Sequence, residues 1–195
     1  MPRTSAVAPQ MPSNARQPNR GRACRTAALA AAAAALALQA PAPAQGAACA
    51  NASAAPGSVD NAALRRAMRC LVNQERAGQG LRRLRRNGDL GEAARRHARD
   101  MVERGYFAHE RPGSTLGSRL RAAGWTGEVA AEALGWGCGG LGVPRAVLDG
   151  WLASPKHRDI VLGRNNHGGV GLAVGAPYPT DCPGAGMWVL VAGRY

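Results

Sequence analysis

The sequence contains few aromatic residues and almost no lysine. Only eight of its 195 residues are Trp, Tyr or Phe, and Lys156 is the single lysine among 25 Lys and Arg residues. The densest basic stretch, LRRLRR at residues 81–86, contains no aromatic residue on which a nucleobase could stack. Nucleic-acid binding is therefore not expected. We predict that this stretch is a solvated face with at most a weak attraction to anionic envelope surfaces.

Several motifs of common catalytic sites are also absent from the sequence. There is no H-E-x-x-H helix of zinc proteases, no G-x-S-x-G elbow of serine hydrolases and no C-x-x-C pair of zinc ribbons. The glycine-rich GWGCGG at 135–140 lacks the lysine of a phosphate-binding loop. Ser114 and Ser154 stand where helix caps are expected, so neither is predicted to be a nucleophile.

The first 44 residues contain no acidic residue and are typical of an export signal. Five arginines precede or flank the apolar run TAALAAAAAALALQA at 26–40, which is followed by small residues at 42–44. This order predicts a secretory signal peptide over residues 1–44, cleaved after Ala44, and a secreted or periplasmic protein. Removing it lowers the net charge from +13 to +8. The apolar run is too short for a membrane span, so an integral membrane protein is not expected.

Four cysteines remain after the predicted cleavage site. An even number in an oxidising compartment predicts two disulfides, for which three pairings are open. We favour Cys49–Cys70, which would tie the N-terminal segment to the first helix. We also favour Cys138–Cys182, which would tie a loop to the C-terminal strand region. Lipid attachment through Cys49 is an alternative to a freely secreted chain.

Apolar residues recur at helical spacing over most of the chain and form two short runs near its end. The pattern predicts a linker at 45–58, helices at about 60–78, 89–104, 115–123, 143–153 and 155–162, and strands at 168–176 and 186–193. Helices followed by strands favour an α+β fold over alternating βαβ units. His97 lies on the apolar face of the second helix, where we expect a core histidine with satisfied hydrogen bonds.

Four segments follow one another in a recognisable order and spacing: LVNQERAGQGL at 71–81, ARRHARDMVERGYFAH at 94–109, WLASPKHRDIVL at 151–162 and GVGLAVG at 169–175. Together they resemble the bacterial, secreted SCP-like branch of the CAP superfamily, which groups cysteine-rich secretory proteins, antigen 5 and plant pathogenesis-related 1 proteins. The resemblance implies a three-layer α-β-α sandwich with a small antiparallel sheet between helices, in a CAP domain at 59–195. It also implies a concave site of histidines and acids that often holds a divalent metal.

Three residues match the site positions of that family: His109 after the aromatic pair, Glu132 in AAEAL and His157 in SPKH. The family's further glutamate before the V-G-x-G strand is replaced here by Gly169, and the nearby His167 is a further candidate ligand. Two imidazoles and a carboxylate suit zinc or a related divalent ion, with other positions left for water or a ligand.

These residues lead to one preferred function and two alternatives. We expect a secreted binding module with a His- and Glu-lined groove that can hold a divalent metal, zinc above all. Its ligand would be a lipid, a glycan or a protein of the cell envelope, and the chain is expected to be a monomer. The first alternative is a metal-assisted hydrolase with Glu132 as general base or ligand. The second is a structural, disulfide-tied envelope protein with a decayed site, and the missing glutamate at Gly169 disfavours the hydrolase.

Overall fold

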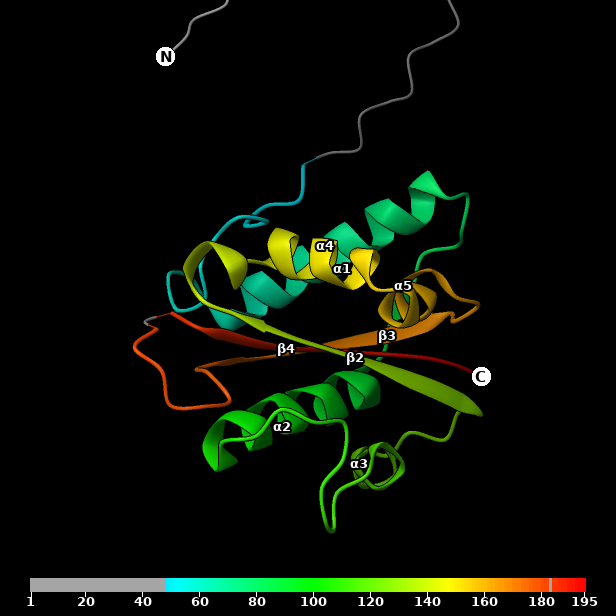
Figure 1. Ribbon diagram of the computed structural model, residues 1–195. Helices are drawn as coiled ribbons and strands as arrows, with labels where there is room; N and C mark the ends of the chain where they lie inside the picture. Colours follow the sequence, from blue (N-terminus) through cyan, green and yellow to red (C-terminus); the bar gives the residue numbers. More distant parts are fainter. Residues whose placement is uncertain (1–47, 183) are drawn as a thin grey trace, which may run out of the picture. The chain divides into compact units, whose positions relative to one another are not determined.

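A four-stranded sheet lies between two layers of helices in this computed structural model, which describes residues 48–182 and 184–195 (Figure 1). The order of strands in the sheet is β1-β3-β4-β2. Strand β4 pairs antiparallel with β2 and β3, whereas the short β1 pairs parallel with β3. The bounds of the strands are Arg85–Arg86 for β1, Val129–Gly137 for β2, His167–Val174 for β3 and Gly186–Arg194 for β4.

Helices cover both faces of the sheet (Figure 1). On one face lie α1 (Asn61–Gly78), α4 (Pro144–Ala153) and α5 (Pro155–Leu162), and on the other lie α2 (Gly88–Arg104) and α3 (Leu116–Ala123). A 3-10 turn, η1 (Gly139–Leu141), follows β2. The predicted α+β class and the three-layer sandwich are confirmed. The signal peptide predicted at 1–44 lies outside the described residues and stays a prediction.

Each helical layer has its own hydrophobic core against the sheet. The core under α1 and α4 includes Leu64, Met68, Leu148, Trp151 and Trp188. The core under α2 and α3 includes Leu90, Ala94, Met101, Met187 and Val189. Both sets recur at the helical or alternating spacing that lets one face of an element pack inward. The predicted helices therefore form nearly where the apolar pattern placed them.

Helix α2 approaches β3 backbone to backbone at two glycines of the strand. A Cβ atom on Gly169 would overlap the backbone of Leu90 and Gly91, and one on Gly171 would overlap the backbone of Ala94. Two strand glycines therefore set the distance between the sheet and the helix that ends just before His109.

Both favoured disulfides are formed, Cys49 with Cys70 of α1 and Cys138 with Cys182. Because the Cys49 sulfur is bonded to Cys70, it is not available for the lipid thioether of the anchoring alternative. From residue 48 onward the segment expected to be a linker packs on the domain, since Ala52 contacts the core under α1. Among the described residues, no helix combines the length and the apolar character needed to cross a bilayer.

Candidate functional site

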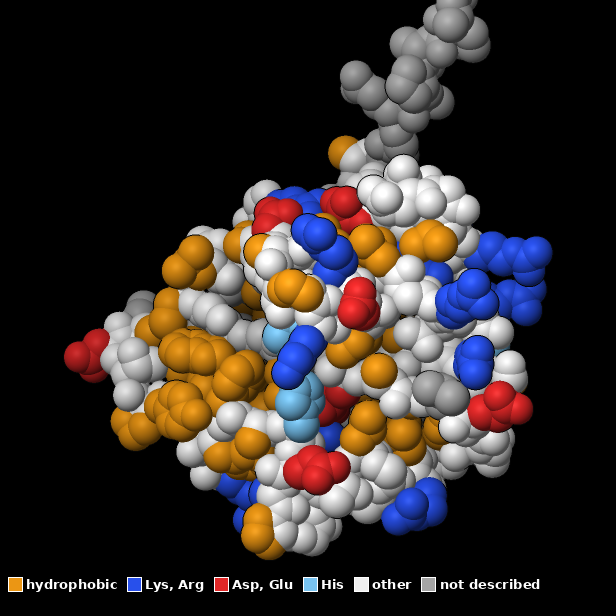
Figure 2. All heavy atoms as spheres, turned by 45° about the vertical axis from the view of Figure 1, so that its right-hand side comes forward, with side chains coloured by type: hydrophobic (Ala, Val, Ile, Leu, Met, Phe, Trp, Pro, Cys, Tyr) orange, Lys and Arg blue, Asp and Glu red, His pale blue; other side chains and the backbone are white. Residues whose placement is uncertain are grey.

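Histidine side chains border a hollow on one face of the molecule, next to a broad area of hydrophobic side chains (Figure 2). His109 comes from the loop after α2, and His157 from the first turns of α5. The pKa of His157 is lowered, first by partial burial and then by the neighbouring charge of His109. The charge of His109 thus acts on His157, although 48 positions separate the two residues in the sequence.

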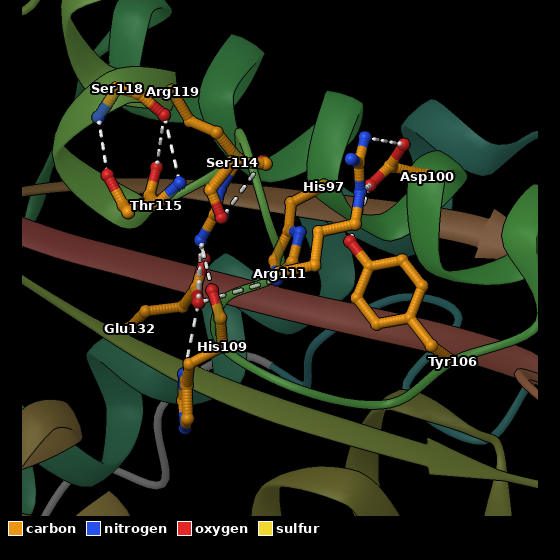
Figure 3. Close-up of polar contacts among 10 residues, drawn as sticks. All are labelled: His97, Asp100, Tyr106, His109, Arg111, Ser114, Thr115, Ser118, Arg119 and Glu132. Atoms are coloured by element: carbon orange, nitrogen blue, oxygen red, sulfur yellow. Dashed lines mark hydrogen bonds and ion pairs between the residues drawn. The ribbon is translucent and has the colours of Figure 1, made fainter.

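Glu132 lies behind His109, on the face of β2 that points toward α2 and α3 (Figure 3). Its side chain is only 2% exposed, and its Oε1 lies 3.0 Å from Nδ1 of His109. Both carboxylate oxygens also accept hydrogen bonds from Nη2 of Arg119, each at 3.1 Å. Because a carboxylate oxygen accepts, Nδ1 of His109 carries the hydrogen of this bond, and Nε2 is the ring nitrogen that Glu132 does not engage. His109 itself is 54% exposed, so Glu132 orients a ring that solvent can reach.

Arg119 of α3 is the cation that makes a buried Glu132 tolerable, and the sequence analysis missed it. Its Nη2 also donates to the backbone oxygen of His109 at 2.9 Å, so one guanidinium holds both the acid and the loop (Figure 3). Thr115, rather than the predicted Ser114, caps α3 by accepting from the backbone N–H of Ser118. The available signal was position, because Arg119 lies three residues after Leu116 and four before Ala123, which both pack against the core under α2 and α3.

The loop that carries His109 is also clamped to α2 through Asp100. Arg111 donates to both oxygens of this carboxylate at 2.7 and 2.9 Å, and the Tyr106 hydroxyl donates to it at 2.5 Å. These hydrogen bonds, those of Arg111 first, hold the pKa of Asp100 far below its usual range. Arg104 adds a further bond at 2.7 Å. The loop is thus fixed on both sides of His109, which pre-positions the ring.

His97 of α2 is buried, as expected, but its hydrogen bonds are not satisfied. Its side chain is 0% exposed, and Nε2 lies 3.6 Å from Oε1 of Glu132, too far for a good hydrogen bond. Neither ring nitrogen makes a well-aligned hydrogen bond to any described residue. Burial lowers the pKa of His97, while Glu132 and the backbone of Ala108 act in the opposite direction. His97 is therefore a neutral imidazole directly behind the Glu132 carboxylate.

This burial predicts a loss of stability in mild acid. The unfolded chain takes up a proton on His97 below about pH 6.5, whereas the native chain resists it until lower pH. The free energy of unfolding should therefore fall as the pH drops from about 7 to 5, by up to about 1.4 kcal/mol per pH unit from this group. Urea unfolding of wild type and His97→Leu at several pH values measures this, and the variant should show the shallower slope. Equal slopes would contradict the assignment.

The predicted three-residue ligand set does not form a metal cage. No group of three His, Cys, Asp or Glu side chains in the described part of the chain is arranged to hold an ion. The reason is that Arg119 and His109 already engage the oxygens of Glu132. Within the predicted set Glu132 therefore orients His109 and is not itself free to coordinate an ion, which leaves the imidazoles of His109 and His157 as the candidate ligands.

His167 and Gly169 do not contribute to this site. His167 opens β3, where its Nδ1 lies 2.7 Å from the side-chain oxygen of Asn166 and its ring contacts the rings of Trp125 and Tyr195. The candidate role of His167 as a fourth ligand therefore has no support in the geometry. A glutamate has no room at Gly169 because the backbone of α2 occupies the position of its Cβ.

The model of the CAP family, described as the cysteine-rich secretory protein family, matches residues 70–191. This chain belongs to the CAP family. The matched CAP span includes His109, Glu132 and His157. The uncharacterized protein YkwD of Bacillus subtilis is 33% identical over 123 residues, which cover 61% of this chain and 45% of that protein. The CAP chain therefore spans less than half the length of this relative.

Solved structures share the CAP fold at low sequence identity. An outer surface protein of Borrelia burgdorferi superposes with a TM-score of 0.60 at 18% identity, covering 70% of this chain and 96% of that one. An extracellular protein of Bacillus anthracis containing an SCP domain gives 0.54 at 23% identity, covering 71% and 45%. A cysteine-rich secretory protein of Staphylococcus aureus gives 0.52 at 16% identity, covering 71% and 41%. These likenesses establish the fold of the CAP domain.

Proposed function

We propose that this protein is a secreted binding module that holds a divalent metal, zinc above all, between His109 and His157. The observation that carries the proposal is the hydrogen bond from Nδ1 of His109 to the buried Glu132, which keeps Nε2 clear of that carboxylate, while the charge of His109 acts on a second imidazole, His157. Imidazole nitrogens are common ligands of zinc, and a carboxylate on the far ring nitrogen strengthens such a ligand. The remaining coordination positions would be open to water or to a ligand.

Two disulfides and the CAP family membership support export of the protein. A relative of the same fold is described as extracellular and another as an outer surface protein. The hydrophobic area beside the histidines (Figure 2) favours a lipid, glycan or protein ligand with an apolar part. Partly buried Phe107 lies two residues before His109 in this region of the chain.

The same geometry disfavours the hydrolase alternative. A general base must reach the proton that it removes, but Arg119 engages both oxygens of Glu132 and His109 engages one of them. Glu132 therefore acts here as a positioning residue. A bound zinc would supply Lewis acidity at the hollow, and the protein residues would hold and orient it.

Thermal melting with and without zinc tests the proposal. Saturating zinc should raise the melting midpoint of the oxidised wild-type protein by about 5 °C, because the ion binds the native state alone. His109→Ala and His157→Ala should each abolish the rise. His167→Ala is the matched control, since it removes an imidazole outside the site and should keep the full rise.

Two outcomes would contradict this function. A rise of equal size in all three alanine variants would place the zinc elsewhere on the protein. No rise in wild type at any zinc concentration would leave the structural, disulfide-tied alternative. Glu132→Gln tests whether Glu132 coordinates the zinc or only orients His109. If it only orients His109, the substitution should weaken zinc binding by about 10- to 100-fold and not abolish it.

A further inference from the structure

A second site lies at the other edge of the sheet. The histidine site adjoins the edge strand β2, whereas a cavity of about 250 Å³ lies between α1, α2 and the opposite edge strand β1. Five arginines from three elements line this cavity: Arg65, Arg66, Arg69, Arg86 and Arg95. Among the described residues that line it, none is acidic and none is aromatic.

The close contact of α2 with β3 builds this cavity. Gly91 and Gly169, where helix and strand backbones touch, line it together with Val170. Arg65 and Arg69 are four residues apart on α1 and so project from one face of that helix. Asn87, which caps α2, also lines the cavity, so the positive end of that helix dipole adds to the arginine charge.

The arginines lack enough carboxylates to neutralise them. Glu92 binds Arg95 at 2.5 Å, and Asp60 acts on Arg65 only at longer range. The pKa of Arg65 is lowered, first by burial and then by the charge of Arg95. The pKa of Arg69 is lowered in the same way, by burial and then by Arg86. Like charges held this close destabilise the native state unless an anion joins them.

We propose that this cavity binds a ligand carrying two or more phosphate groups. Guanidinium groups bind phosphate oxygens in pairs of parallel hydrogen bonds, and several converging arginines match a polyvalent anion. The absence of aromatic residues from the described lining disfavours nucleic acid, whose bases need stacking partners. The volume of about 250 Å³ suits a small phosphorylated group, either a soluble oligophosphate or the headgroup of a phospholipid.

Tripolyphosphate is the probe that tests this site, measured by titration calorimetry and thermal melting. Wild type should bind it and gain about 5 °C in melting midpoint at saturation. The double variant Arg65→Gln/Arg69→Gln should lose at least about tenfold in affinity, since each charge-assisted pair contributes 1.5 kcal/mol or more, roughly tenfold. Without ligand it should melt no lower than wild type, because two repelling charges are gone.

The matched control is Arg121→Gln/Arg164→Gln, which removes the same charge from exposed positions outside the cavity. It should bind tripolyphosphate like wild type. Equal weakening in both double variants would overturn the site, because net charge alone would then explain binding. An equal midpoint rise with sodium chloride at matched ionic strength would overturn it too. If the first variant folds poorly, Arg66→Gln/Arg86→Gln repeats the test at two exposed cavity positions.

Vesicles distinguish the two sources of phosphate. Phosphatidylcholine vesicles with and without cardiolipin, whose headgroup bears two phosphates, are mixed with wild type and the Arg65→Gln/Arg69→Gln variant. Cardiolipin-dependent sedimentation that the variant loses supports the site with a lipid headgroup as ligand. Tripolyphosphate binding without vesicle binding supports the site with a soluble ligand. Binding of neither probe overturns the proposal.

Discussion

Replacing Arg76 with methionine should lower the free energy of unfolding by about 3 kcal/mol or more, and the melting midpoint by roughly 10 °C. Arg76 is 2% exposed and donates hydrogen bonds to four backbone oxygens. The acceptors are Arg82, Val161, Gly163 and Asn165, at 2.7 to 3.0 Å. Methionine fills a similar volume but leaves these carbonyls without a donor, at about 1–3 kcal/mol for each that water cannot reach.

The guanidinium of Arg76 therefore supplies the donors for one backbone oxygen of the loop before β1 and for three at the end of α5 and in the loop before β3. Urea unfolding of Arg76→Met against Arg83→Met, an exposed arginine of the following loop, measures the effect at equal charge. The control should stay within about 0.5 kcal/mol of wild type. A loss below about 1 kcal/mol for Arg76→Met would show that water replaces the guanidinium.

Substituting Gly169 with alanine should prevent stable folding. The new Cβ would overlap the backbone of Leu90 and Gly91, which cannot move aside as a side-chain end can. Overpacking of side chains alone costs about 1–3 kcal/mol, so a backbone clash should exceed about 3 kcal/mol. Gly169→Glu, which restores the family's usual residue, should be at least as damaging. Soluble yield and melting midpoint measure both variants.

Gly150→Ala is the control for this experiment. Gly150 lies inside α4, and no atom would contact its Cβ within 4 Å. Alanine there should raise the free energy of unfolding by about 0.5–1 kcal/mol, because it restricts the unfolded chain and favours the helix. If Gly169→Ala melts near wild type, then α2 can shift away from β3 and the close contact is not required.

The apolar pattern predicted the helices well because each buries one continuous stripe of its surface. It missed β2, which has the sequence VAAEALGWG. Small residues there give little strand signal. Close neighbours from α4 and η1 leave little room for a larger side chain at Gly135 and Gly137. All nine residues of this strand pair with β4. A local sequence pattern does not reveal pairing between segments that are distant in the chain.

The residues of the candidate site that match family positions could be predicted from the sequence, whereas the residues that support them could not. His109, Glu132 and His157 were identified by resemblance, whereas Arg119 and Arg76 were not. Both missed arginines lie on otherwise apolar helix faces, as His97 does, and Glu132 lies between alanines on β2. A charged residue on such a face indicates a buried partner, but the partner comes from another element and only the fold reveals it.

The contact between α2 and β3 also determines which parts of the protein can respond to a ligand. At Gly169 and Gly171 backbone meets backbone, so no side chain lies between α2 and β3 there that could slide or repack, and the two elements should move together at this contact. The loop around His109 does not share this backbone contact, and moving it on ligand entry would require breaking its polar clamps at Asp100 or Arg119.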